Sequence, residues 1–139
     1  MRLDVILRIT SKLILPFILL FALYVHFHGD FGPGGGFQAG VIAAGMLILF
    51  SIIFGVYAAK QVVSETVATV MVPLGILIYA SAGIPALLVN QNYLNFSVLS
   101  EDTAHGQHIG ILWVEVGVLT TVAGSMISIF YALVQRGRS

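Results

Sequence analysis

The chain has 139 residues, of which 58% are hydrophobic and only 9% are charged, and its formal net charge is zero. A soluble domain typically carries about 25% charged residues, and a chain this short cannot hide so much apolar surface in one core, so an ordinary soluble domain is excluded. Zero net charge leaves no basic surface for nucleic acid, and the lack of cysteine excludes disulfides and Cys-ligated metal sites.

Four apolar segments are each long enough to cross a hydrocarbon core of about 30 Å as an α-helix. We predict spans over Ile6–Phe27, Gln38–Ala59, Thr66–Val89 and Ile109–Val134. Backbone polar groups must be paired within each segment in lipid, which leaves helices as the only suitable structure. The first segment resembles a signal peptide, but its length and the lack of a cleavage site favour a retained helix. The sequence therefore predicts an all-α integral membrane protein with one four-helix domain, residues 1–139.

Basic residues predict the orientation of these helices. All six Lys and Arg residues fall at the same side of the predicted membrane, and the first and third loops contain none; the six are Arg2, Arg8, Lys12, Lys60, Arg136 and Arg138. Loops rich in Lys and Arg stay in the cytoplasm. We therefore expect both termini to be cytoplasmic, with the first and third loops on the outer side.

The first loop is the most unusual stretch of the sequence. It contains Pro33 followed by three consecutive glycines, Gly34, Gly35 and Gly36, which permit positive φ angles and close backbone approach. The loop lacks the Gly-Lys-Ser/Thr ending of a phosphate-binding loop. We predict a tight, glycine-lined reversal between the first two helices.

Small residues and prolines shape the next two helices. Gly36, Gly40 and Ala44 recur every four residues, a spacing that lets another helix approach closely in lipid. The third helix contains Pro73 and the sequence Gly83–Pro85, so we expect it to be kinked or interrupted. Such a break occurs at ion sites of some transporters, but it is more often a kink satisfied by neighbouring helices.

The third loop, Asn90–Gln107, is too apolar to be fully solvated. We expect its apolar side chains to lie in the membrane interface or under a partner subunit; they are Tyr93, Leu94, Phe96, Val98 and Leu99.

Glu115 is the one acidic residue within the fourth predicted span, about six residues or 9 Å from its outer end. A carboxylate there costs free energy, and such residues usually face a bundle interior or a wet cavity on a proton or cation path. The alternative is a carboxyl group that is hydrogen-bonded to a partner chain in a purely structural role.

All four histidines fall at the predicted outer ends of the first and fourth helices: His26, His28, His105 and His108. Histidine titrates near neutral pH, so these side chains, with Asp30 and Glu115, could guide protons. Zinc binding by the same residues is a weaker alternative. Interfacial histidines without a transport role are an equally open interpretation of the pattern. We expect no resident metal and no cofactor.

The residues around the glycines resemble a known family. The run His28-Gly29 and then Pro33-Gly34-Gly35-Gly36-Phe37-Gln38-Ala39-Gly40 is similar to the signature of the MnhB/MrpB family, a family of small membrane subunits of the multisubunit Mrp-type Na⁺/H⁺ antiporters. The size, the four helices and the position of Pro16 agree with it.

The resemblance implies an accessory subunit, not an enzyme, in the cytoplasmic membrane of a bacterium. Its partners would be the large antiporter-like subunits, the small membrane subunits, Na⁺, H⁺ and lipid. The complex would export Na⁺ in exchange for H⁺, and this chain would pack beside the larger ones, with Glu115, the histidines and Asp30 as candidates for an ion path.

Three alternatives remain open. A related subunit serves ion-pumping, membrane-bound hydrogenase-type complexes, where its role would be purely structural. A free-standing small transporter is disfavoured because four-helix multidrug exporters place their essential Glu in the first helix, and here that helix has no acid inside the bilayer. A membrane-bound metalloenzyme would have to use the outer histidines.

Overall fold

The computed structural model describes residues 2–29 and 31–137, and all the regular secondary structure in these residues is helical. In chain order the helices are α1 (Arg2–Phe27), α2 (Gly36–Phe54), α3 (Val56–Val62), α4 (Glu65–Ser81), α5 (Ile84–Leu88), the 3₁₀ helix η1 (Phe96–Leu99) and α6 (Thr103–Arg136). Four segments are long and apolar enough to cross a membrane: Asp4–Phe27, Gly36–Phe54, Glu65–Leu88 and Thr103–Arg136. The predicted all-α membrane fold with four spanning helices is confirmed.

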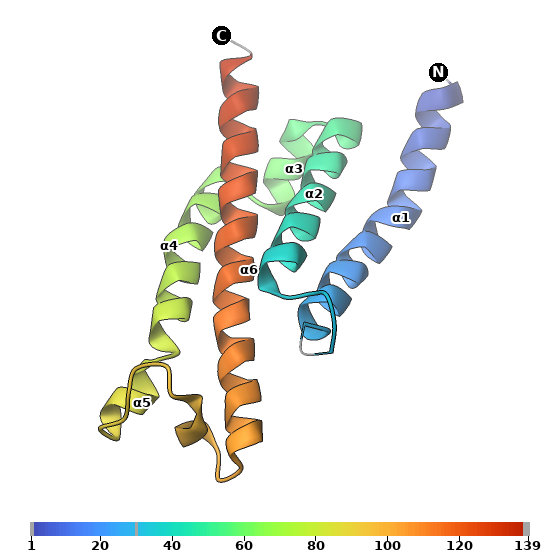
Figure 1. Cartoon of the computed structure of the whole chain (residues 1–139). Helices are drawn as coiled ribbons and strands as arrows, with labels where there is room; N and C mark the ends of the chain where they lie inside the picture. The colour runs from blue at the N-terminus through green and yellow to red at the C-terminus, as the bar shows by residue number, and fades with distance from the viewer. Residues whose placement is uncertain (1, 30, 138–139) are drawn as a thin grey trace.

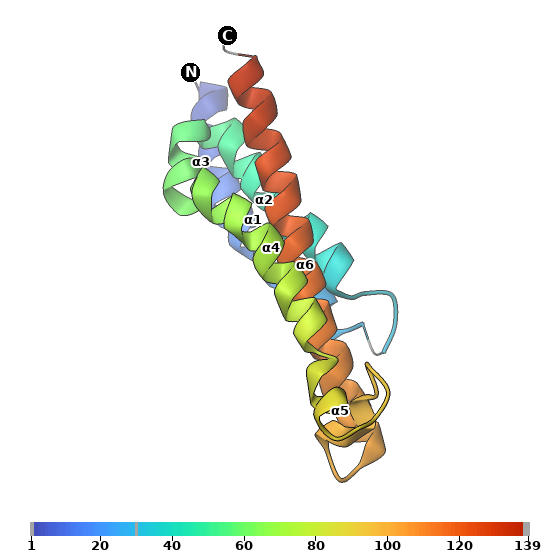
Figure 2. The ribbon, with the colours of Figure 1, turned by 90° about the vertical axis from the view of Figure 1, so that its left-hand side faces the viewer.

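The four long helices form roughly one layer instead of a closed bundle. In Figure 1 they stand side by side in the order α4, α6, α2, α1, and after a 90° turn in Figure 2 they overlap. α6 packs along α4 and α2, whereas α1 packs on α2. The N- and C-terminal ends of the chain lie toward the same end of the molecule (Figure 1). A single layer leaves two broad faces without a helix from this chain.

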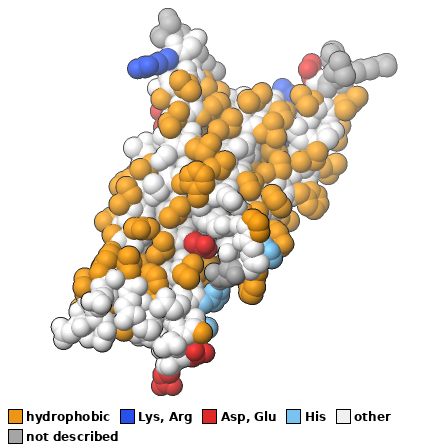
Figure 3. Space-filling model, in the orientation of Figure 1, with side chains coloured by type: hydrophobic (Ala, Val, Ile, Leu, Met, Phe, Trp, Pro, Cys, Tyr) orange, Lys and Arg blue, Asp and Glu red, His pale blue; other side chains and the backbone are white. Residues whose placement is uncertain are grey.

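Hydrophobic side chains cover these faces. Figure 3 shows them across most of the visible middle of the molecule, with Lys and Arg toward the end that carries the termini and His toward the opposite end. Even large residues such as Phe17, Leu77 and Ile52 are more than 60% exposed. Apolar exposure on this scale fits a surface that faces lipid or other membrane chains.

The helices differ from the predicted spans at their ends. α2 ends at Phe54, five residues before the predicted end, because Gly55 adopts a φ of +98° that breaks the helix before α3. The third span is interrupted at Ala82 and Gly83, as expected from Gly83–Pro85. α6 begins at Thr103, six residues before the predicted start of the fourth span.

The small-residue face of α2 packs against α6 of the same chain. Gly36, Gly40 and Ala44 are all buried. A Cβ atom at Gly40 would lie 2.9 Å from the carbonyl oxygen of Leu119 and 3.0 Å from Cβ of Val122. The close helix contact that the spacing predicts is therefore present, and it is made with α6 of the same chain.

The third loop also finds its partners within the chain. The Tyr93 hydroxyl donates a hydrogen bond to the carbonyl of Ala80 at 2.7 Å. Its ring packs where a side chain on Gly83 would lie, and the Phe96 ring does the same at Gly110. Tyr93 and Phe96 thus cover glycines of the α4–α5 break and of α6, while Tyr93 remains 47% exposed. The predicted place of the loop in the membrane interface or under a partner subunit stays a prediction.

A polar cluster joins α3, α4 and α6 at the end opposite this loop. Lys60 forms an ion pair with Glu65, and Gln135 Nε2 donates to Glu65 Oε1 at 2.7 Å. The Tyr131 hydroxyl donates to the carbonyl of Val63 at 2.7 Å, and the Lys60 Nζ lies 5.6 Å from the centroid of the Tyr131 ring. This cluster fixes the short α3–α4 connection to the end of α6.

Replacing Tyr131 by Phe tests that connection. Tyr131 is only 2% exposed, so Tyr131→Phe removes the hydroxyl but keeps the buried ring. We expect the protein in detergent to lose about 1 kcal/mol of stability, because the Val63 carbonyl loses one hydrogen bond. Thermal unfolding measures the effect. The control is Tyr57→Phe, whose side chain is 77% exposed; equal melting of the two variants would contradict the prediction.

Candidate ion-pathway site

The glycine-rich turn closes tightly between α1 and α2. The amide of His28 donates to the Tyr24 carbonyl at 3.0 Å, and the amide of Gly35 donates back to the Val25 carbonyl at 3.1 Å. Gly35 has φ +128° and ψ −178°, a conformation essentially restricted to glycine. The turn therefore folds back onto the last turn of α1, as the Pro and Gly content predicts.

Two further glycines of the turn lie close to neighbouring backbone, and Gly34 leaves no room for a side chain. A Cβ atom at Gly34 would lie 2.6 Å from the Val25 carbonyl oxygen, nearer than any real Cβ contact. One at Gly29 would lie 3.2 Å from the backbone of Gly35. The remaining motif residues Pro33, Phe37 and Gln38 are exposed, so one side of the motif packs inward and the other faces outward.

The Glu115 side chain lies against this turn. Its Oε1 atom would be 2.9 Å from a Cβ at Gly29 and 3.1 Å from one at Gly35. Its backbone lies directly against Gly36, where a Cβ would be 3.0 Å from the Glu115 Cα. The Glu115 residue itself is half-buried. The carboxyl group on α6 and the glycine turn, about 80 residues apart in sequence, thus form one site.

Glu115 lies well inside α6 but beside the first residue of α2. It is the thirteenth residue of α6, about 18 Å from the first. However, it contacts the first residue of α2, Gly36. Glu115 is therefore level with the N-terminal end of α2, next to the glycine turn. The first three turns of α6 extend past the α1–α2 turn, which the sequence did not predict.

The histidines do not form one cluster. His26 is 3% exposed, and its buried Nδ1 has no hydrogen-bond partner among the residues that the structure describes. The half-buried His28 ring stacks on Tyr24, with centroids 5.0 Å apart. His105 and His108 are exposed on the first two turns of α6. Asp30 lies outside the described residues.

No group of three or more His, Cys, Asp or Glu side chains suited to a metal ion occurs in the described part of the chain. What the fold brings together is Glu115 with Gly29, Gly35 and Gly36. His26 and His28 lie at the α1 end of the same turn, whereas His108 is seven residues from Glu115 along α6, about 10 Å.

Two side-chain contacts of α1 and α6 were not predicted. Trp113 Nε1 donates to the Ser81 hydroxyl at 3.1 Å and so holds α6 to the end of α4, two residues before Glu115. Tyr24, four residues before His28, stacks on its ring. The spacing of Tyr24 and His28 on one helix is visible in the sequence, but nothing in the sequence pairs Trp113 with Ser81.

The fold and composition define a polytopic membrane protein with a carboxyl group placed against a glycine hairpin. The chain belongs to the MnhB family: residues 6–128 match the family described as a domain related to the MnhB subunit of Na⁺/H⁺ antiporter. The predicted family is thereby confirmed.

Two relatives illustrate the membership. The chain is 31% identical to an antiporter subunit mnhB2 of Staphylococcus haemolyticus, over 94% of each chain. It is also 31% identical to a subunit of the Na⁺/H⁺ antiporter of Alkalihalophilus pseudofirmus, over 86% of this chain and 89% of that one. Both relatives carry the names of antiporter subunits.

Proposed function

We propose that this chain is an accessory membrane subunit of a multisubunit Na⁺/H⁺ antiporter, and that the complex exports Na⁺ in exchange for H⁺. The proposal includes a single four-helix domain over residues 1–139 in the inner membrane of a bacterium, with both termini in the cytoplasm. Family membership and the names of the relatives support the antiporter. The distribution of Lys and Arg supports the orientation.

Companion subunits are expected on the two open faces of the helix layer. A closed bundle buries apolar side chains in a core between its own helices. This layer instead exposes many large apolar residues, which other membrane chains can cover. The larger antiporter-like subunits and the small membrane subunits of the same complex would pack there. Because the α2 small-residue face is filled by α6, these contacts would use the bulkier outer side chains.

The observation that carries a role in ion movement is the contact between Glu115 and the glycine turn. An ionisable group in a spanning segment usually marks an ion or proton path. Here the Glu115 carboxyl group lies close against Gly29 and Gly35, so the lack of side chains on the turn leaves room for that group. We place Glu115 on the path, with His26 and His28 at the neighbouring end of α1 and His108, His105 and Asp30 as outer candidates.

The antiporter assignment is tested in the assembled complex. Everted membrane vesicles are prepared from cells that lack other Na⁺/H⁺ antiporters and contain the complex with or without this chain. We expect Na⁺-dependent proton flux only with the chain, and co-purification of the chain with the large antiporter-like subunits. Equal flux without it, or purification with hydrogenase-type subunits, would refute the assignment.

A further inference from the structure

A groove separates α1 from α2 on the side of the molecule away from the glycine turn. The two helices meet at the turn and diverge toward the end that carries the termini (Figure 1). The groove has a volume of about 540 Å³, within the range of small-molecule sites. It is lined mainly by α1 and α2, with one residue of α3, and the lining includes Lys12, Leu15 and Leu19 from α1 and Met46, Phe50 and Phe54 from α2.

The groove is charged at one end and apolar at the other. Lys12 lines it, with Nζ 5.9 Å from the centroid of the Phe54 ring. Leu15, Pro16 and Leu19 follow along α1 toward the turn and bring no charge. Because α2 ends at Phe54, the ammonium group lies level with the end of a spanning helix, where lipid headgroups begin.

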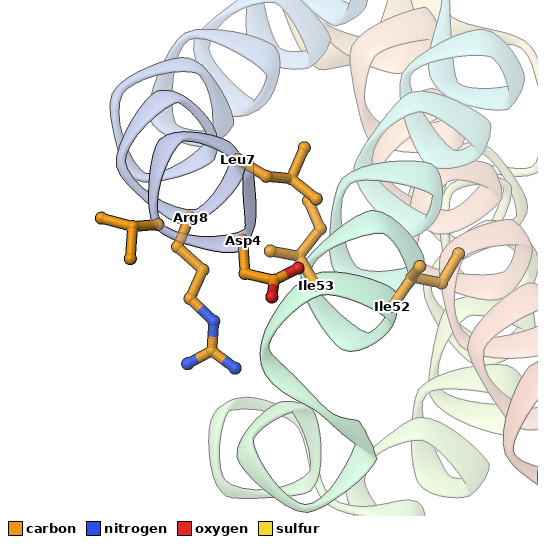
Figure 4. Close-up of a pocket in the computed structure, with 6 residues that line it drawn as sticks. Asp4, Leu7, Arg8, Ile52 and Ile53 are labelled. Atoms are coloured by element: carbon orange, nitrogen blue, oxygen red, sulfur yellow. The ribbon is translucent and has the colours of Figure 1, made fainter. Parts of the chain in front are cut away.

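A second hollow of about 420 Å³ lies between the first turns of α1 and the last turn of α2. It is lined by Arg8 and by Asp4, with Ile52 and Ile53 from α2. Figure 4 shows Arg8 reaching from α1 into open space beside α2, while Leu7 and Ile53 point toward one another. Arg8 and Lys12 are one helical turn apart. The space between α1 and α2 is therefore lined at this end by two basic side chains, Arg8 and Lys12, and one acidic side chain, Asp4.

We propose that the α1–α2 groove binds an anionic phospholipid, with one acyl chain along Leu15, Leu19 and Met46 and the phosphate at Lys12 and Arg8. The groove is basic at one end and apolar along the rest, as the headgroup and acyl chain of such a lipid require. Basic pockets between spanning helices bind anionic headgroups. An apolar helix from another protein would leave Lys12 desolvated without an anion. Lys60, the other lysine of this end, already pairs with Glu65.

The test measures lipid retention by the assembled antiporter complex in detergent, using native mass spectrometry. Phosphatidylglycerol and phosphatidylcholine are added in separate experiments. We expect phosphatidylglycerol to be retained more tightly, and Lys12→Gln to weaken its retention about fivefold, the loss of one headgroup contact. Lys60→Gln is the matched control, since it removes a lysine of the same end that does not line the groove, and should retain phosphatidylglycerol as the unchanged complex does.

The acyl-chain end is tested by Leu19→Trp, which fills the groove but leaves both cations in place. We expect it to lower retention of both lipids and to abolish labelling of α1 and α2 by a phosphatidylglycerol with a photoreactive acyl chain. Equal retention of the two lipids, no effect of Lys12→Gln, or labelling absent from α1 and α2 of the unchanged complex would overturn the proposal. The last result would mean that a partner helix fills the groove.

Discussion

Glu115→Gln is expected to reduce Na⁺-dependent proton flux of the assembled complex at least roughly tenfold, since a group that can no longer exchange a proton loses its acid–base role. Glutamine has nearly the shape of glutamate, so the packing against Gly29 and Gly35 is kept. The amount of complex in the membrane should therefore stay unchanged. Flux is measured in everted vesicles as Na⁺-induced collapse of a preformed pH gradient.

Two further variants separate a role in ion movement from a structural one. Glu65→Gln removes an acid from the opposite end of the layer, where Glu65 pairs with Lys60 and Gln135, and should leave flux near the unchanged level. Glu115→Asp keeps a titratable carboxyl group and should restore part of the flux lost in Glu115→Gln. Full flux in Glu115→Gln would assign Glu115 a purely structural role.

Gly75→Val is expected to prevent stable packing of α4 on α6, with a loss of roughly 3 kcal/mol, the upper end of the usual cost of overpacking. A Cβ atom at Gly75 would lie 2.6 Å from both the carbonyl oxygen of Gly117 and the amide nitrogen of Thr121. These are backbone atoms of α6, which cannot rotate away as a side chain can, so the helices must separate.

Glycines of α6 make equally close contacts with the backbone of α4. A Cβ at Gly117 would lie 2.7 Å from the amide nitrogen of Tyr79, and one at Gly124 would lie 2.9 Å from the carbonyl oxygen of Ala68. We expect Gly75→Val to lower the amount of folded protein in the membrane and its recovery with the complex. Gly45→Val is the control, since a Cβ there would meet no atom within 4 Å apart from its chain neighbours and its own helix backbone. Equal recovery of both variants would show that the contact is looser than described.

Local chemistry accounts for most of what the sequence predicted correctly. Long apolar runs in lipid have few structures open to them, so four helices followed from composition and length. Pro33 and the glycines after it predicted the tight turn, and Gly83–Pro85 predicted the break between α4 and α5. The ends were less accurate, because Gly55 terminates α2 within an apolar run that hydropathy alone extends to Ala59.

Which helices pack against each other could not be predicted from local sequence features. The four-residue spacing of Gly36, Gly40 and Ala44 predicted a close neighbour, but spacing does not identify that neighbour, which proved to be α6. The apolar residues of the third loop posed the same problem, since Tyr93 and Phe96 pack on glycines of their own chain.

The membrane-spanning character, the four long helices, the glycine turn and the family could all be predicted from the amino-acid sequence, because hydrophobicity, segment length and glycine conformations act locally. The folded chain was needed to find the contact of Glu115 with Gly29 and Gly35, and the groove with Lys12 at one end where α1 and α2 diverge from the turn. Both depend on the axial register of α6 against α2 and on the angle between α1 and α2, which many distant side-chain contacts set together.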